Sequence, residues 1–349
     1  MSHANKTPRI LITMGDPAGI GPEICVKALA DRDVYGVCRP VVVGDAAVLQ
    51  RAVETAGARV VLKPIGDISH AVFETGNVDV LDLKNVDLAL VEWGKVSAAA
   101  GKAAFEYVRA GVELAMSGAA DAIVTGPINK EAINMAGYHY AGHTEILAEF
   151  TGSRDYAMML VDGGLRVVHT STHVSLREAC DRVKRGRVLI VIQLAHQAAK
   201  DLGIACPRVG VAGLNPHAGE GGLFGTEEIE EIIPAIDDAR ALGIDAVGPV
   251  PPDSLFAKAR GGHFDIVVAM YHDQGHIPVK TVGFELDEAT GLAKAVRGVN
   301  VTLGLPIVRT SVDHGTAFEI AGTGKANHES MKEAVLMAVC LVQGRLSGR

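Results

Sequence analysis

Short runs of β-branched and other apolar residues alternate with longer segments of helical periodicity along most of this chain. The apolar runs predict buried strands at residues 9–14, 40–43, 122–125, 208–212, 264–270 and 299–303. The helical patterns cover residues 20–30, 98–116, 181–202, 226–242 and 330–345. Strands that are apolar on both faces and alternate with helices are typical of parallel sheets. The sequence therefore predicts an α/β fold with largely parallel sheets.

Residues 156–170 depart from this alternation. Two apolar runs flank the turn signal Asp162-Gly163-Gly164, which favours a β-hairpin. We therefore expect an antiparallel arm within or beside the sheet.

We predict two α/β lobes, the first formed by residues 1–128 and 305–349 and the second by residues 129–304.

Charge and hydropathy exclude several classes of partner. The chain of 349 residues has 33 Lys and Arg against 41 Asp and Glu, a net charge of −8, without a local basic cluster. This balance disfavours nucleic acids and anionic membranes. The longest apolar runs, 188–195 and 334–342, are shorter than the ~20 residues of a membrane span. With no signal-peptide core at the N-terminus, we expect a cytoplasmic protein.

The cysteines follow no pattern of a disulfide framework or a thiolate metal site. They are scattered, odd in number and never spaced as a CxxC pair. We expect all five to be buried, reduced thiols: Cys25, Cys38, Cys180, Cys206 and Cys340.

A glycine-rich turn follows the first predicted strand and opens a helix. It spans residues 15–23, with the sequence GDPAGIGPE. This is the position of a phosphate-binding turn in nucleotide-binding proteins, yet the sequence fits neither GxGxxG nor GxxxxGK[ST]. A tight structural turn with Pro22 in the first turn of the helix is an equally good interpretation.

Three histidines follow apolar runs that are predicted strands, namely His173, His217 and His272. Open α/β sheets bind ligands outside the carboxyl ends of their strands. Neutral imidazoles that converge there would form an open metal site, suited to zinc, cobalt or manganese better than to magnesium. The alternative is three separate structural histidines with ordinary hydrogen bonds.

Positive residues also lie near strand ends. Lys280 follows His272 by eight residues, and Arg309 follows a further apolar run. His143 and Thr144 open an apparent helix, whose N-terminal amides favour an anion. Together these residues could hold a small phosphorylated acid, although surface salt bridges or a helix cap would also explain them.

Five motifs together resemble the 4-hydroxythreonine-4-phosphate dehydrogenase family, over about residues 9–325. They are 14–23 (MGDPAGIGPE), 142–145 (GHTE), 215–220 (NPHAGE), 271–275 (YHDQG) and 309–316 (RTSVDHGT). That family uses NAD and a divalent metal (Zn, Co, Mn or Mg) at a site shared between the subunits of a homodimer. The resemblance therefore implies that the second lobe carries metal and substrate residues and the dimer contact. The resemblance implies that His173, His217 and His272 are metal ligands. It also implies substrate contacts at His143, Thr144, Lys280, Asn300 and Arg309.

Residues 314–327 are similar to the adenosine-binding loop of isocitrate and isopropylmalate dehydrogenases, whose two-lobed α/β/α architecture we expect here. The similarity implies cofactor contacts at His314, Gly315, Glu319, Gly322 and Asn327. The Glu319 carboxylate would accept hydrogen bonds from the ribose hydroxyls of NAD and repel the extra phosphate of NADP. We therefore predict NAD as the cofactor.

Residues 283–298 form a longer segment than in the branch of this family that makes pyridoxal phosphate, and His276-Ile277 stands where that branch has a leucine-containing turn. The longer form resembles the branch that acts on D-threonate or D-erythronate 4-phosphate. We predict oxidation at C3 and loss of carbon dioxide, giving dihydroxyacetone phosphate. The alternatives are oxidation of 4-phosphooxy-L-threonine in pyridoxal phosphate synthesis, a dihydrodiol dehydrogenase, and a non-catalytic protein that binds a phosphorylated metabolite.

The predicted mechanism assigns roles by charge. A divalent metal would lower the pKa of the C3 hydroxyl, so that a base removes its proton while the C3 hydride passes to NAD. Asp253 and Asp273 follow probable strand ends and are candidates for metal tuning or proton transfer. Lys280, which we also count among the catalytic candidates, and Arg309 would each give the substrate anion a charge-assisted hydrogen bond of ~1.5 to 3 kcal/mol.

Overall fold

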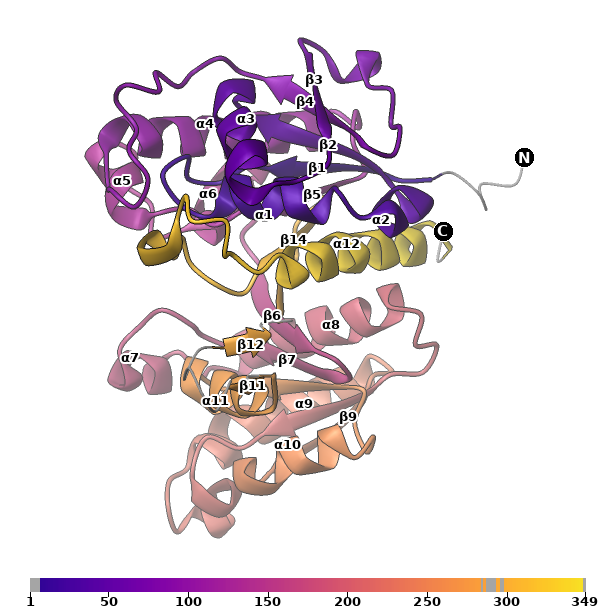
Figure 1. The fold of residues 1–349 in the computed structure, drawn as a ribbon. Coiled ribbons are helices and arrows are strands. Elements are labelled where there is room, and N and C mark those ends of the chain that lie inside the picture. Colours follow the sequence, from indigo (N-terminus) through magenta and orange to yellow (C-terminus); the bar gives the residue numbers. More distant parts are fainter. Residues whose placement is uncertain (1–6, 284, 287–292, 296–297, 348–349) are drawn as a thin grey trace. The chain divides into compact units, whose positions relative to one another are not determined.

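The computed structural model describes residues 7–283, 285–286, 293–295 and 298–347. Contacts divide the described chain into two compact units, coloured along the sequence in Figure 1. Unit 1 comprises residues 7–154 and 305–347, and unit 2 comprises residues 155–304. The chain therefore leaves unit 1 once and returns to it, and both described ends belong to unit 1.

The strands of unit 1 form a parallel sheet in the order β3-β4-β2-β1-β5-β14. Its centre is apolar because Ile10, Leu11 and Ile12 of the first strand are fully buried. The strands are β1 (Arg9–Thr13), β2 (Arg39–Gly44), β3 (Val61–Ile65), β4 (Asn77–Asp82), β5 (Ala122–Thr125) and β14 (Val308–Val312).

Helices cover both faces of this sheet. Ile123 of β5 faces α4, where a Cβ on Gly111 would lie 2.7 Å from its Cδ1. On the opposite face, Thr310 of β14 donates a hydrogen bond to the carbonyl of Ala334 in α12. The helices of unit 1 are α1 (Gly21–Ala28), α2 (Arg32–Val37), α3 (Ala46–Ala56), α4 (Ala98–Met116), α5 (Lys130–Met135), α6 (His143–Thr151) and α12 (Glu329–Ser347), with short 3-10 turns at η1 (Ile68–His70) and η4 (Phe318–Ile320).

The strands of unit 2 follow one another in the order β13-β6-β7-β10-β8-β9. Strand β6 is antiparallel to both of its neighbours, whereas β7, β10, β8 and β9 run parallel to one another. The bounds are β6 (Ala157–Asp162), β7 (Leu165–His169), β8 (Arg208–Ala212), β9 (Asp245–Val250), β10 (Ile266–Ala269) and β13 (Val299–Leu303). A separate antiparallel pair joins β11 (Glu285–Leu286) and β12 (Ala293–Ala295).

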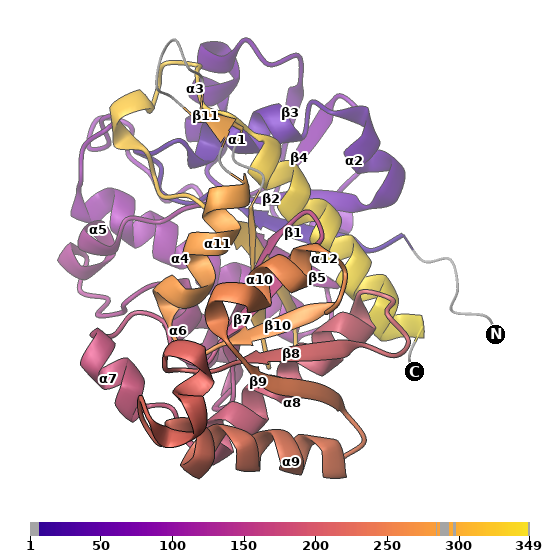
Figure 2. The ribbon, with the colours of Figure 1, turned by 90° about the horizontal axis from the view of Figure 1, so that it is seen from below.

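The helices of unit 2 pack on the same sheet. α8 contacts β8 and β10, and so does α10 (Figure 2). α11 lies against β6 and β7. The helical segments are α7 (Leu176–Asp181), α8 (Arg185–Asp201), η2 (Pro216–Gly222), η3 (Glu228–Ile232), α9 (Ile233–Ala241), α10 (Pro252–Arg260) and α11 (His272–Gly283). Within the described residues, no helix is long and apolar enough to cross a membrane.

The predicted fold class is confirmed, including the antiparallel hairpin at β6 and β7 with Gly163 and Gly164 at its turn. The boundary after residue 128 differs from the observed division, which falls after Arg154. Residues 129–154 lie in unit 1 because Ile133 of α5 and Leu147 of α6 share a buried cluster with Phe105 of α4.

The cysteine prediction holds only in part. All five thiols are free, and Cys25 and Cys38 are buried. Cys206 and Cys340 are exposed, contrary to the prediction, because one lies in the turn before β8 and the other on the outer side of α12. Burial raises the pKa of both the Cys25 and the Cys38 thiol to about 12, so these two stay protonated.

Candidate functional site

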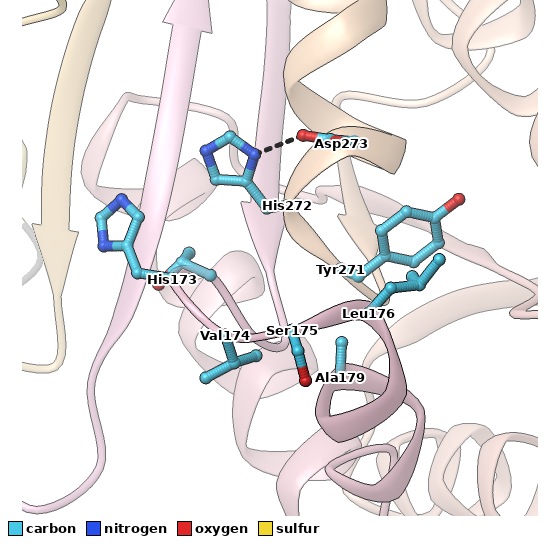
Figure 3. A pocket seen from close by; sticks show the side chains of 9 residues that line it. His173, Val174, Ser175, Leu176, Ala179, Tyr271, His272 and Asp273 are labelled. Atoms are coloured by element: carbon cyan, nitrogen blue, oxygen red, sulfur yellow. Dashed lines mark hydrogen bonds and ion pairs between the residues drawn. The ribbon is translucent and has the colours of Figure 1, made fainter.

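A pocket of about 500 Å³ in unit 2 contains two of the predicted metal ligands. β7 and β10 are parallel neighbours, so the segments that follow their carboxyl ends lie side by side. The rings of His173 and His272 lie next to one another in the pocket, with centroids 5.7 Å apart (Figure 3). The pocket is lined by Thr172, His173, Val174, Ser175, Leu176, Ala179, Tyr271, His272 and Asp273.

Asp273 fixes the proton of the neighbouring imidazole. Its Oδ1 lies 2.7 Å from Nδ1 of His272, and a carboxylate can only accept there. Nδ1 therefore carries the hydrogen, and Nε2 keeps a lone pair on the side of His173 (Figure 3). A carboxylate behind a histidine in this way is the usual support of a metal-binding imidazole, so this pair fits a divalent cation.

The third histidine lies on a left-handed turn that follows β8. His217, Ala218, Gly219, Glu220 and Gly221 all have φ between 44° and 81°. His217 is exposed, and its Nδ1 lies 3.2 Å from a carboxylate oxygen of Glu220. Throughout the part of the chain that the structure describes, no three His, Cys, Asp or Glu side chains are grouped to hold a metal ion within one copy. The three-histidine site therefore stays a prediction.

Glu228 organises the loop that carries His217. Its buried carboxylate accepts hydrogen bonds from the main-chain N–H of Leu214 and of Asn215, each at 2.7 Å, and from the Asn215 side-chain amide at 2.9 Å. Three donors on one buried carboxylate hold both sides of the loop together. Sequence reasoning missed this residue because it lies in an acidic run that looks like a solvated helix face.

Unit 1 holds a buried cation beside two of the predicted substrate residues. Arg309 on β14 is 3% exposed and donates from Nη2 to Oγ1 of Thr125 at 2.7 Å. Burial lowers the pKa of Arg309 to about 9, although the charge of Glu145 acts in the opposite direction. A guanidinium held at this depth favours an anion that enters next to it.

His143 lies close to this cation as the first residue of α6, and Thr144 follows it half-buried. Burial, and to a smaller extent the charge of Arg309, hold the pKa of His143 well below its usual value. The ring also bonds to the main chain of Gly126, a contact that favours the protonated ring and is therefore made to the carbonyl. Its Nε2 is buried and has no hydrogen-bond partner among the described residues.

The other candidates are more dispersed. Asp253 is exposed in the first turn of α10, and Lys280 is half-buried in α11. Asn300 on β13 points its amide nitrogen at the sulfur of Met158, 2.8 Å away. The longer segment that the sequence analysis connected with the substrate includes residues 284, 287–292 and 296–297, which lie outside the described residues.

The loop with the predicted cofactor residues rests on α1. The Nζ of Lys27 donates to the carbonyls of Gly324 and Ala326, each at 2.8 Å, while the N–H of Ala326 donates to Glu23 at 2.8 Å. Glu23 and Lys27 also pair with each other at 2.7 Å. Gly322 packs against the ring of Trp93, His314 and Asn327 bond to main-chain groups, and Gly315 and Glu319 are exposed.

The glycine-rich turn has a structural reason for its composition. Gly15 has φ 79°, and a Cβ there would lie 2.5 Å from the carbonyl oxygen of Pro127. The N–H of Asp16 donates to the same oxygen at 2.8 Å, and the N–H of Ile20 donates to Thr316 at 3.0 Å. The turn therefore connects the end of β5 with the start of the predicted cofactor loop.

Asp16 in this turn gives a pH-dependent prediction. Its side chain is fully buried, and burial raises its pKa from 3.8 to about 6. The folded state binds this proton more tightly than the unfolded state, so the stability of the protein falls as the pH rises from about 4 to about 6. Asp16→Asn should therefore stabilise the protein by as much as about 3 kcal/mol at pH 8 and have little effect at pH 4.

Urea unfolding at both pH values measures this difference. Asp31→Asn is the control of opposite sign, because a hydrogen bond from Lys332 lowers the pKa of Asp31. That variant should lose stability at pH 8 and little at acid pH. An equal effect of Asp16→Asn at pH 4 and at pH 8 would contradict the prediction.

The chain is similar to known proteins over most of its length. The chain matches the family described as pyridoxal phosphate biosynthetic protein PdxA over residues 36–338. A D-threonate 4-phosphate dehydrogenase from Cupriavidus necator is 49% identical over 329 residues, which cover 94% of this chain and 95% of that protein.

Two solved structures of dehydrogenases are also similar to this chain over almost its whole length. The crystal structure of 4-hydroxythreonine-4-phosphate dehydrogenase from Klebsiella pneumoniae is 45% identical, covers 96% of this chain and 99% of its own, and has a TM-score of 0.84. A terephthalate 1,2-cis-dihydrodiol dehydrogenase from Burkholderia xenovorans is 34% identical, covers 96% and 98%, and has a TM-score of 0.66. The fold and these relatives define the class, an α/β dehydrogenase. Within that class, the chain belongs to the PdxA family.

Proposed function

We propose that this dehydrogenase oxidises C3 of a 4-phosphorylated four-carbon hydroxy acid, D-threonate 4-phosphate or D-erythronate 4-phosphate, and then releases carbon dioxide. The observation that carries the proposal is the 49% identity with the Cupriavidus necator enzyme over 94% of this chain. The buried cation at Arg309 supports an anionic substrate. Oxidation of 4-phosphooxy-L-threonine is the second candidate, supported by the family description and by the Klebsiella pneumoniae relative.

The residues of unit 1 would bind and orient this substrate. Arg309 would donate charge-assisted hydrogen bonds to its phosphate or carboxylate. Neutral His143 gives its N–H to Gly126, so its buried Nε2 is free to accept a hydrogen bond from a substrate hydroxyl. Thr144 would add a hydroxyl at the start of α6, where the main-chain amides favour negative charge.

The proposed reaction is an oxidation followed by a decarboxylation. A base takes the proton of the C3 hydroxyl, and the C3 hydride passes to NAD, which gives NADH and a 3-keto acid. The bond between C1 and C2 then breaks, its electron pair stays on C2 as an enolate, and carbon dioxide leaves. A proton added at C2 gives dihydroxyacetone phosphate. Because Asp273 already holds His272, we place the proton transfers on Asp253 or Lys280 and give Asp273 the supporting role.

His173, His217 and His272 are the proposed ligands of a divalent cation. When bound, such a cation supplies a Lewis acid that lowers the pKa of a hydroxyl and stabilises enolate charge. His173 and His272 lie together in one copy, and we propose, from the family resemblance, a homodimer with a shared site at which the third ligand completes the set. Neutral imidazole nitrogens suit zinc, cobalt or manganese.

NAD is the proposed cofactor, bound by the loop of residues 314–327. Glu319 is exposed on η4, so its carboxylate can accept hydrogen bonds from a ribose. The same charge would repel the 2′-phosphate of NADP. Faster turnover with NADP than with NAD at equal concentration would contradict this assignment.

The test is NADH formation by metal-reconstituted protein with D-threonate 4-phosphate, D-erythronate 4-phosphate and 4-phosphooxy-L-threonine, each measured at the same concentration. We expect turnover of at least one sugar acid and its loss after chelation of the metal. Coupling to a dihydroxyacetone phosphate reductase would identify the product. Turnover of only the amino acid would contradict the sugar-acid proposal, and tight binding without turnover would identify a binding protein instead.

A further inference from the structure

Two buried histidines that the proposed mechanism does not use lie directly behind His272. His169, the last residue of β7, is 1% exposed, and His276 on α11 is 8% exposed. The Nδ1 of His276 lies 3.1 Å from the Nε2 of His169, which is hydrogen-bond distance. All three imidazoles therefore form one connected group in unit 2.

A main-chain carbonyl shows which ring nitrogens of His169 and His276 carry hydrogen. Nδ1 of His169 lies 3.2 Å from the oxygen of Met158, which can only accept, so this Nδ1 carries a hydrogen. In the neutral ring, Nε2 of His169 is then an acceptor, and the hydrogen between the two rings belongs to Nδ1 of His276. The carbonyl of His272, 3.1 Å from the same Nδ1, requires the same assignment.

His276 also holds the plane of His272. Their rings are stacked, with centroids 3.6 Å apart and planes within 10° of each other. The two residues are four apart on α11, so successive turns of the helix place them on one face. Asp273 holds the edge of the same ring at Nδ1. His272 is therefore fixed on its edge by a carboxylate and on its face by a second imidazole.

Close contact between α11 and β7 keeps this arrangement in place. A Cβ on Gly275 would lie 2.4 Å from Nε2 of His169 and 2.7 Å from a methyl group of Val167. Glycine at this position lets the start of the helix approach the strand closely enough for His276 to reach His169. The support under His272 is therefore part of the buried contact between these two elements.

We infer that His169 and His276 are positioning residues that fix the ring plane of His272 for binding of a divalent cation, while Asp273 fixes its tautomer. The inference rests on the proposed function only in that the ligand is such a cation. It assigns the two histidines no contact with substrate. Supporting contacts of this kind change metal affinity by about 10- to 100-fold in other metalloproteins.

The test measures Zn²⁺ affinity by competition with a chromophoric chelator, on the full-length protein. His276→Leu removes both the stacking and the hydrogen bond, and His276→Phe keeps an aromatic face. Ile277→Ala is the matched control, since Ile277 is the next residue on the same helix and is 62% exposed. We expect weakening of about 10- to 100-fold for leucine, less for phenylalanine and none for the control.

A second readout tests the tautomers directly. In histidine-labelled apoprotein, ¹⁵N NMR should show the hydrogen on Nδ1 of His169, His272 and His276. A hydrogen on Nε2 of His169 or His276 would overturn the inference, as would wild-type Zn²⁺ affinity in folded His276→Leu and His276→Phe. If the unaltered protein binds no Zn²⁺, the proposed metal dependence fails, and the inference fails with it.

Discussion

Arg309→Met is expected to weaken binding of the phosphorylated substrate by about 100-fold while the melting temperature stays the same or rises. The variant removes a charge that burial disfavours, since burial lowers the pKa of Arg309 to about 9. Methionine has a similar volume and removes this desolvation cost, while loss of the hydrogen bond to Thr125 costs about 1 kcal/mol, so the two effects on stability oppose each other. Loss of a charge-assisted hydrogen bond to the substrate anion accounts for the weaker binding. Calorimetric titration and a thermal melt measure the two effects.

Arg187→Met is the matched control for this prediction. Arg187 in unit 2 is half-buried, and its guanidinium donates to the main-chain carbonyls of Thr170 at 3.0 Å and of Tyr156 at 2.9 Å. Its loss leaves two acceptors without their donor, so this variant should melt at a lower temperature and keep its substrate affinity. A lower melting temperature with unchanged affinity in Arg309→Met would instead make Arg309 a structural residue.

The sequence allowed the central strands to be predicted because their side chains are apolar on both faces. Strands β3, β4, β9 and β14 were missed for physical reasons that differ. β14 contains the polar residues Arg309, Thr310 and Ser311, all buried, so Arg309 lies within a strand and not after its end as predicted. β3 contains Lys63 and Pro64 and is mostly exposed, and Gly248 and Pro249 interrupt β9. β4 contains Asp79, a buried carboxylate that accepts hydrogen bonds from the main chain of Val72 and Phe73. A charged residue in a strand is recognised as buried only when its donors are known.

In the candidate site, too, some residues could be predicted from the sequence and others could not. His173 and His272 could be selected because each follows a predicted strand, and adjacent parallel strands bring such residues together. His169 and His276 could not be selected, since their roles depend on contacts between β7 and α11. Glu228 could not be separated by sequence from its acidic neighbours, because only the folded loop shows which carboxylate is buried.

Glu228→Ala is expected to abolish Zn²⁺ binding and to lower the melting temperature by several degrees. The change leaves the N–H groups of Leu214 and Asn215 without their acceptor. It also removes a contact that holds the left-handed turn. The left-handed backbone conformation of each non-glycine residue in this turn costs roughly 1–2 kcal/mol, so the turn should relax to a right-handed or extended conformation. His217 would then lose the position from which we propose that it binds metal. Thermal melts and chelator competition measure both effects.

Two further variants separate the role of the loop from that of the histidine. His217→Ala should lose Zn²⁺ binding and turnover at an unchanged melting temperature, because this side chain is exposed. Glu230→Ala, an exposed carboxylate on the same helical segment, should change neither property. Stoichiometric zinc in His217→Ala would contradict the three-histidine site. Zinc binding by a folded Glu228→Ala would show that His217 keeps its position without the buried carboxylate, and that the strained turn is stabilised by other contacts.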